Sequence, residues 1–209
     1  MSGAALSGTG VLYVMAADAE FGPALRARIA PLMIGIGPVE AGVNLARHLA
    51  LREAAGDSPR LVVSLGSAGS DTLEQAGLYG VRSVRYRDMD VTALGFEKGI
   101  TPLTDLPAEL DLKLTLPGYP TARLSTGAAI VNGDTYRAIE ADMADMETFA
   151  VLRACHSAGV PLLALRGISD GREGLTQYED WLRYLGVIDE KLAGAVDRIE
   201  ALMAARKLI

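Results

Sequence analysis

A chain of 209 residues is long enough to bury one sizeable hydrophobic core, and we expect a single domain over residues 1–209. Its net charge of -6 and pI near 5.0 argue against a nucleic-acid partner, because no basic stripe is present to neutralise phosphates. It has no apolar run of the ~20 residues that a membrane span needs and no basic leader at its start. Its only cysteine, Cys155, excludes disulfides within the chain. These features predict a cytoplasmic protein without a membrane partner.

The first half of the chain alternates apolar runs with helical patterns. Residues 10–17, 32–37 and 61–65 are predicted strands, because strands that are buried on both faces are almost wholly apolar. Helices are predicted over residues 23–29 and 38–51, each with a proline near its start. Residues 66–70 are glycine-containing and are expected to form a loop. Residues 77–86 follow as a further strand.

A long loop and the remaining strands follow. Residues 87–106 read as a loop whose apolar members, among them Leu94, indicate a partner surface or a pocket lid. The rest of the chain is predicted to hold strands over 121–132, 143–146 and 163–171, and helices over 147–156 and 178–207. A turn at 133–136 and a glycine-rich loop after residue 171 complete the pattern. The alternation predicts a three-layer α/β/α fold with a mixed, mostly parallel central sheet.

Polar and aromatic residues recur where the predicted strands end. They are Glu20, Ser67, Tyr136, Glu147, Arg166 and Asp170. An aspartate at the end of a buried strand points into the crevice where open α/β sheets bind ligands. Burial there raises the pKa of a carboxyl group, which can then protonate a leaving group. Structural roles are the alternatives: Asp170 can form a turn with Gly171, and Glu20 can complement a helix dipole.

Several stretches, in order along almost the whole chain, resemble the purine nucleoside phosphorylase superfamily and, more closely, the methylthioadenosine/S-adenosylhomocysteine nucleosidases. They are residues 16–20, 35–37, 66–69, 85–95, 132–134, 145–147 and 166–170. The resemblance implies a nucleoside phosphorylase-like fold. It also implies hydrolysis of the bond between adenine N9 and ribose C1′.

The resemblance also implies roles for the reacting groups. Asp170 is expected to be the general acid at adenine N7, with Ser169 beside it at the exocyclic amine. Glu20 is expected to orient and deprotonate the attacking water, with help from Ser67 and Arg166. Protonation at N7 lets adenine leave as a neutral molecule, while nearby carboxylates stabilise an oxocarbenium-like transition state.

The substrate-binding residues follow from the same resemblance. Glu147 is expected to bind the ribose hydroxyls, Met146 to pack under the sugar, and Tyr136 to stack on the base. Further contacts are expected from Ile36, Ala68, Gly69, Tyr178 and, from a partner subunit of a homodimer, Leu94. The sequence has no metal-ligand cluster and no cofactor motif, so neither a metal nor a cofactor is expected.

The chain is shorter than the family pattern in three places. An expected strand pair before residue 35 is missing, the segment 107–122 is too short for the usual helix, and the interval 136–145 is reduced. The sequence leaves open whether the substrate is 5′-methylthioadenosine, S-adenosylhomocysteine or 5′-deoxyadenosine. A phosphorylase, a hydrolase of another purine nucleoside such as futalosine, and a binding protein without turnover are the alternatives. Asp18 and Glu20 favour water as the nucleophile, because acidic side chains repel phosphate.

Overall fold

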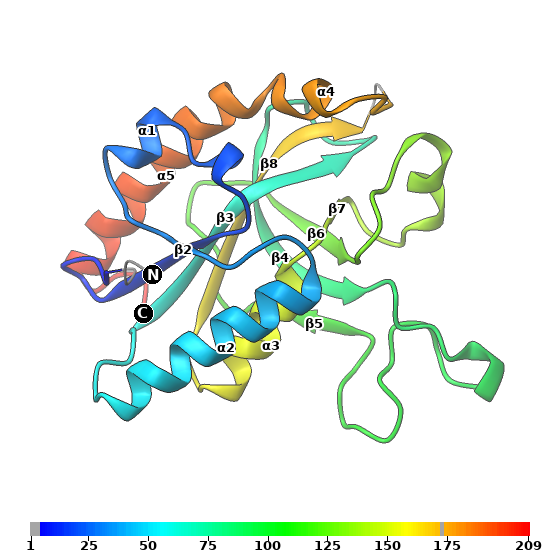
Figure 1. The fold of residues 1–209 in the computed structure, drawn as a ribbon, viewed down its shortest axis with the longest axis horizontal. Helices are drawn as coiled ribbons and strands as arrows, with labels where there is room; N and C mark the ends of the chain where they lie inside the picture. The colour runs from blue at the N-terminus through cyan, green and yellow to red at the C-terminus, as the bar shows by residue number, and fades with distance from the viewer. Residues whose placement is uncertain (1–4, 172–173) are drawn as a thin grey trace.

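An eight-stranded mixed sheet runs through the centre of the molecule, with helices on both faces (Figure 1). The computed structural model describes residues 5–171 and 174–209, so residues 172–173 of the predicted glycine-rich loop lie outside the described residues. The strands are β1 Val11–Met15, β2 Leu32–Met33, β3 Leu61–Ser70, β4 Leu78–Tyr86, β5 Glu109–Asp111, β6 Thr121–Thr126, β7 Met143–Asp145 and β8 Leu162–Gly171. The helices are α1 Pro23–Arg26, α2 Pro38–Ala54, α3 Thr148–Ser157, α4 Tyr178–Leu182 and α5 Leu185–Ala204.

Strand pairing confirms the predicted mixed, mostly parallel sheet. β1 pairs in parallel with β2 and β3, β3 with β8, β4 with β6, and β6 with β7. β4 pairs antiparallel with β5 and β8, and a single antiparallel pair, Gly69 with Ala144, joins β3 to β7. β1, β3 and β8 run side by side in one direction, so their carboxyl ends meet at one edge, where α/β sheets bind ligands.

Two hydrophobic cores, one on each face of the sheet, establish the three layers. Along β1, Leu12 and Val14 point into the core beneath α2 and α3, while Val11, Tyr13 and Met15 point into the core beneath α1 and α5. This alternation follows from the period of two in a strand. Because both faces are covered, β1 has the wholly apolar sequence that predicted it.

The structure differs from the predicted secondary structure in several places, and the predicted strand 121–132 ends at Thr126 in β6. The predicted loop 66–70 is the end of β3, because these residues pair one by one with β8 from Arg166 to Gly171, with a register shift at Ala68/Gly69. The strand β5 is not predicted by the sequence pattern, and it lies at the sheet edge. The predicted helix 178–207 is two helices, α4 and α5, separated at residues 183–184. Among the described residues, no helix is both long and apolar enough to cross a membrane.

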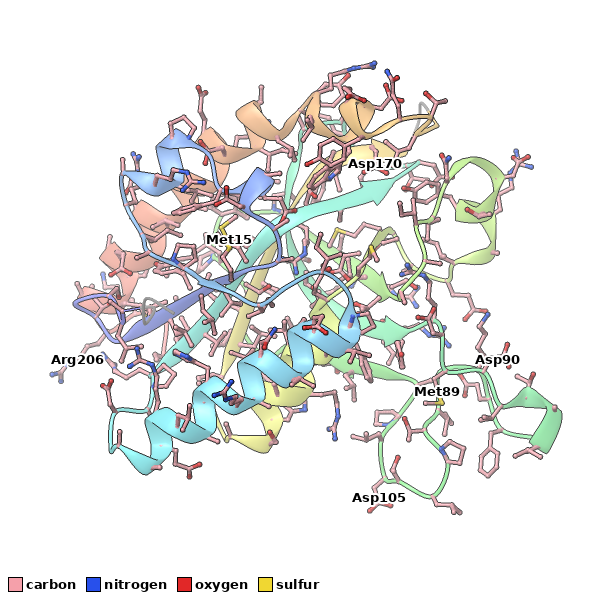
Figure 2. The ribbon with its side chains drawn as sticks, in the orientation of Figure 1. Met15, Met89, Asp90, Asp105, Asp170 and Arg206 are labelled. Atoms are coloured by element: carbon pink, nitrogen blue, oxygen red, sulfur yellow. The ribbon has the colours of Figure 1, made fainter. Side chains whose placement is uncertain are left out.

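The predicted long loop extends away from the sheet. Figure 2 shows Met89, Asp90 and Asp105 on this segment, well separated from Asp170. It contains the short 3₁₀ helix η2, Thr92–Leu94, and the side chain of Leu94 is 74% exposed there.

Candidate active site

A cavity of about 890 Å³ lies at the carboxyl ends of β1, β3 and β8. The predicted site residues lie together in its wall, except for Arg166 and Leu94. Those that line it are Glu20, Ile36, Ser67, Ala68, Gly69, Tyr136, Met146, Glu147, Ser169, Asp170 and Tyr178. The carboxylates at positions 20, 147 and 170, which come from three distant parts of the chain, therefore share one cavity.

Glu20 is held in the 3₁₀ turn η1, Asp18–Glu20, which follows β1. Its Oε1 accepts hydrogen bonds from the backbone N–H of Ser67 at 2.6 Å and from the Ser67 hydroxyl at 2.7 Å. Burial raises the pKa of Glu20, whereas the Ser67 hydrogen bonds and the positive charge of Arg166 lower it. Opposed effects of this kind suit a carboxylate that must accept a proton near neutral pH.

Asp170 stands at the end of β8 with a donor on each carboxylate oxygen. Ser169 donates to Oδ1 at 2.6 Å, and the Tyr136 hydroxyl donates to Oδ2 at 3.1 Å. Burial raises the pKa of Tyr136, and the charge of Asp170 raises it further, so the phenol keeps its proton. A Cβ on Gly69 would lie 1.9 Å from the Tyr136 hydroxyl, so only glycine leaves room for this contact.

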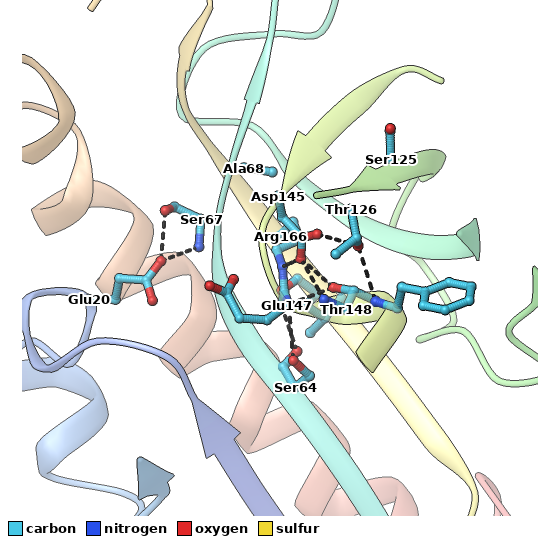
Figure 3. Close-up of polar contacts among 12 residues, drawn as sticks. Glu20, Ser64, Ser67, Ala68, Ser125, Thr126, Asp145, Glu147, Thr148 and Arg166 are labelled. Atoms are coloured by element: carbon cyan, nitrogen blue, oxygen red, sulfur yellow. Dashed lines mark hydrogen bonds and ion pairs between the residues drawn. The ribbon is translucent and has the colours of Figure 1, made fainter. Parts of the chain in front are cut away.

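Glu147 immediately precedes α3, and its Oε1 accepts a hydrogen bond from the backbone N–H of Gly37 at 2.8 Å. Burial raises the pKa of Glu147 to about 7, and the neighbouring negative charge of Asp145 adds to this effect. In Figure 3 the Glu147 carboxylate is directed across β3 toward Glu20. The cavity therefore holds two carboxyl groups whose pKa values are raised by burial.

Arg166 lies behind the cavity wall in a buried hydrogen-bond network (Figure 3). Its Nε donates to Asp145 Oδ2 at 3.1 Å, and one Nη donates to Thr148 Oγ1 at 2.7 Å and to Ser64 Oγ at 3.1 Å. The expected help for Glu20 therefore comes through the charge of the guanidinium. A second cavity of about 10 Å³ touches Glu20 and Arg166, and this volume is close to that of one water molecule.

The sequence analysis missed three residues that shape the site. Asp145 accepts hydrogen bonds from Thr126 at 2.6 Å and from Arg166, and so anchors the buried network. Arg87 lines the cavity and donates to the backbone carbonyls of residues 125, 127, 129 and 145. Trp181 lines the cavity and donates its indole N–H to Ser67 Oγ at 3.1 Å. The first two lie within the stretches that carry the resemblance, which is the signal that could have found them.

Asp18 and Leu94, which the sequence pattern singled out, do not line the cavity. Asp18 forms an ion pair with Arg26 at 2.7 Å and its side chain is 79% exposed, so only Glu20 of the two acidic residues faces the cavity. Leu94 lies in η2 on the extended segment and does not line the cavity of its own chain. In the described ranges 5–171 and 174–209, no three His, Cys, Asp or Glu side chains are grouped to hold a metal ion.

The chain is similar in sequence to a known protein family and to characterised proteins. The family profile described as "Phosphorylase superfamily" matches residues 121–200. The 5′-methylthioadenosine/S-adenosylhomocysteine nucleosidase of Haemophilus influenzae (strain 86-028NP) is 31% identical over 195 residues, which cover 82% of this chain and 81% of that protein.

Two solved structures share the fold. The Campylobacter jejuni nucleosidase has a TM-score of 0.75 at 18% identity, with 93% of this chain and 100% of that chain covered. The Colwellia psychrerythraea 34H nucleosidase, solved in complex with adenine, has a TM-score of 0.69 at 20% identity, with coverage of 90% and 94%. The identity to the Haemophilus protein over most of both sequences shows that this chain belongs to the 5′-methylthioadenosine/S-adenosylhomocysteine nucleosidase family.

Proposed function

We propose that this protein hydrolyses the N-glycosidic bond of 5′-methylthioadenosine, S-adenosylhomocysteine or 5′-deoxyadenosine and releases adenine. The observation that carries the proposal is the convergence of Glu20, Glu147 and Asp170 on one cavity. Family membership supports the same reaction, since the Haemophilus relative is named for the first two substrates. The Colwellia structure, solved in complex with adenine, supports the product.

In the proposed reaction, Asp170 acts on the purine base, and Glu20 and Glu147 act on the ribose. Asp170 donates a proton to adenine N7, so that the electron pair of the breaking C1′–N9 bond leaves with a neutral base. Tyr136 and Ser169 hold the Asp170 carboxyl in place. Positive charge develops on the ribose ring at that moment, and the carboxylates of Glu20 and Glu147 stabilise it.

Water completes the reaction at C1′. Glu20 accepts a proton from the water while the water oxygen bonds to the anomeric carbon, and the products are adenine and the free sugar. Oε1 of Glu20 is already engaged by Ser67, so Oε2 is the oxygen that we assign to the water. Glu147 and Met146 are assigned to the ribose, and Arg166 supports Glu20 through its charge.

We further propose that two copies of the chain form a homodimer, in which Leu94 of one copy reaches the cavity of the other. Leu94 is exposed on a segment that extends from the sheet, and Ile36, Val39 and Val43 form an exposed apolar strip beside the cavity. Sedimentation velocity tests this proposal: a dimer that Leu94→Glu dissociates supports it, and a monomer at all concentrations contradicts it.

A panel of nucleosides tests the proposed reaction. The purified protein is incubated with 5′-methylthioadenosine, S-adenosylhomocysteine, 5′-deoxyadenosine and futalosine, with and without phosphate, and the free base is measured. Adenine release without phosphate is the expected result. Release only with phosphate would instead support a phosphorylase. Binding of the nucleosides without release of any base would support a protein that has lost turnover.

A further inference from the structure

Trp181 forms a hydrogen bond with Ser67 that the proposed mechanism does not use. Its indole N–H donates to Ser67 Oγ at 3.1 Å, and Ser67 Oγ donates to Glu20 Oε1 at 2.7 Å. The three side chains form a chain of hydrogen bonds from α4 to η1. They come from separate segments of the sequence, and all three line the large cavity.

The direction of this chain follows from the chemistry of its members. An indole N–H can only donate, and a serine hydroxyl carries one hydrogen and two lone pairs. Ser67 Oγ must therefore accept from Trp181, and its own hydrogen is directed to the carboxylate of Glu20. Hydrogen bonds in series also strengthen one another, so the indole makes the Ser67 hydroxyl a better donor.

We propose that Trp181 is a positioning residue for Glu20: it fixes the Ser67 hydroxyl in the orientation that holds the carboxylate for its reaction with water. This inference rests on the proposed function of Glu20. It links the carboxylate to the α4 segment, so that the geometry at Glu20 depends on how α4 is docked.

The docking of α4 is itself well defined. Asp180 Oδ2 accepts hydrogen bonds from the backbone N–H and hydroxyl of Thr176 at 2.9 and 2.8 Å, and from the N–H of Gln177 at 3.2 Å. Asn132 pairs with both the N–H and the carbonyl of Leu175, at 2.9 and 2.8 Å. The Asp180 contacts fix the turn that begins α4, and the Asn132 contacts tie the segment that carries Trp181 to another residue of the cavity wall.

The acid limb of the pH–rate profile depends on the pKa of Glu20, and that pKa depends on the hydrogen bond from Ser67. Donation from Ser67 favours the ionised form of Glu20, so weaker donation raises the pKa of Glu20. Arg166 on β8 and Glu147 before α3 interact electrostatically with Glu20, and Asp189 is buried on α5, the helix that contacts η1. Replacement of Trp181 by phenylalanine leaves all three in place.

The kinetic test compares Trp181→Phe, which keeps an aromatic ring but lacks the N–H, with Leu182→Ala as a control on the same helix. We expect Trp181→Phe to lower kcat by roughly threefold to tenfold, the effect of one hydrogen bond, with little change in KM. Its acid limb should move to higher pH. In a Ser67→Ala background the same replacement should have no further effect. Additive losses, or an equal loss in Leu182→Ala, would show that Trp181 only packs.

A second readout needs no substrate. Trp181 is the only tryptophan of the chain, so intrinsic fluorescence reports on it alone. We expect its emission to titrate with Glu20 at a pH above the ordinary range of a glutamate, because burial raises the pKa of Glu20, and the step to be absent in Glu20→Gln. An unchanged step in Glu20→Gln, or no step in the wild type, would overturn the coupling. If the wild type released no purine base, the proposed function would fall, whereas this titration would still decide whether Trp181 senses Glu20.

Discussion

Replacement of Glu147 by glutamine should stabilise the protein above neutral pH. Burial raises the pKa of Glu147 from its ordinary 4.5 to about 7. The folded protein therefore holds a proton that the unfolded chain releases between these two pH values. The stability that protonated Glu147 contributes is fully present below the pKa that this side chain has in the unfolded chain. It is lost as the pH rises through the pKa that the side chain has in the folded protein. The difference of about 2.5 units corresponds to about 3 kcal/mol.

Urea denaturation at about pH 4.5 and about pH 8 tests this magnitude. Glutamine resembles the protonated side chain and can still accept the hydrogen bond from Gly37. We expect Glu147→Gln to exceed the wild type by about 3 kcal/mol in free energy of unfolding at the higher pH, and to equal it at the lower pH. The variant should also lose activity, because it lacks the carboxylate assigned to the ribose. A difference that does not change with pH would refute the argument from burial.

Two further replacements test the contacts behind the carboxylates. Gly69→Ala places a methyl group where the Tyr136 hydroxyl lies, so it should break the hydrogen bond to Asp170 and lower kcat/KM about tenfold or more. Unchanged kinetics would show that this bond is dispensable. Arg166→Met leaves Asp145 buried without its cation and should lower the free energy of unfolding by about 3–5 kcal/mol, measured in urea. A loss below about 1 kcal/mol would mean that the hydrogen bonds from Thr126 and Thr148 alone satisfy this carboxylate.

The layers and the sheet could be predicted because buried parallel strands have distinctive sequences. β1 is wholly apolar, β8 opens with the apolar run Leu162–Leu165, and the prolines near the starts of α1 and α2 mark their helices. The end of β3 could not be recognised, because its glycines are typical of loops and only the pairing with β8 makes them a strand. The break between α4 and α5 is hidden by apolar spacing that continues across it.

The sequence could place site residues that lie near or just after the carboxyl ends of strands. Glu20, Ser67 and Asp170 line one cavity as expected, because the carboxyl ends of their neighbouring strands meet. Arg166 was expected to help Glu20, and its side chain forms an ion pair with Asp145, a partner that is distant in sequence and that the pattern could not indicate. Trp181 could not be found from the sequence, because helical spacing does not reveal that its N–H meets a serine on β3.

The central claim is that a partly buried acid at position 170 and a water-activating carboxylate act on one purine nucleoside. The most direct test is adenine release from 5′-methylthioadenosine by Asp170→Asn in phosphate-free buffer, with thermal unfolding measured in parallel. We predict a rate lowered by about a hundredfold or more, with a Tm close to that of the wild type. Undiminished adenine release by this variant would contradict the account.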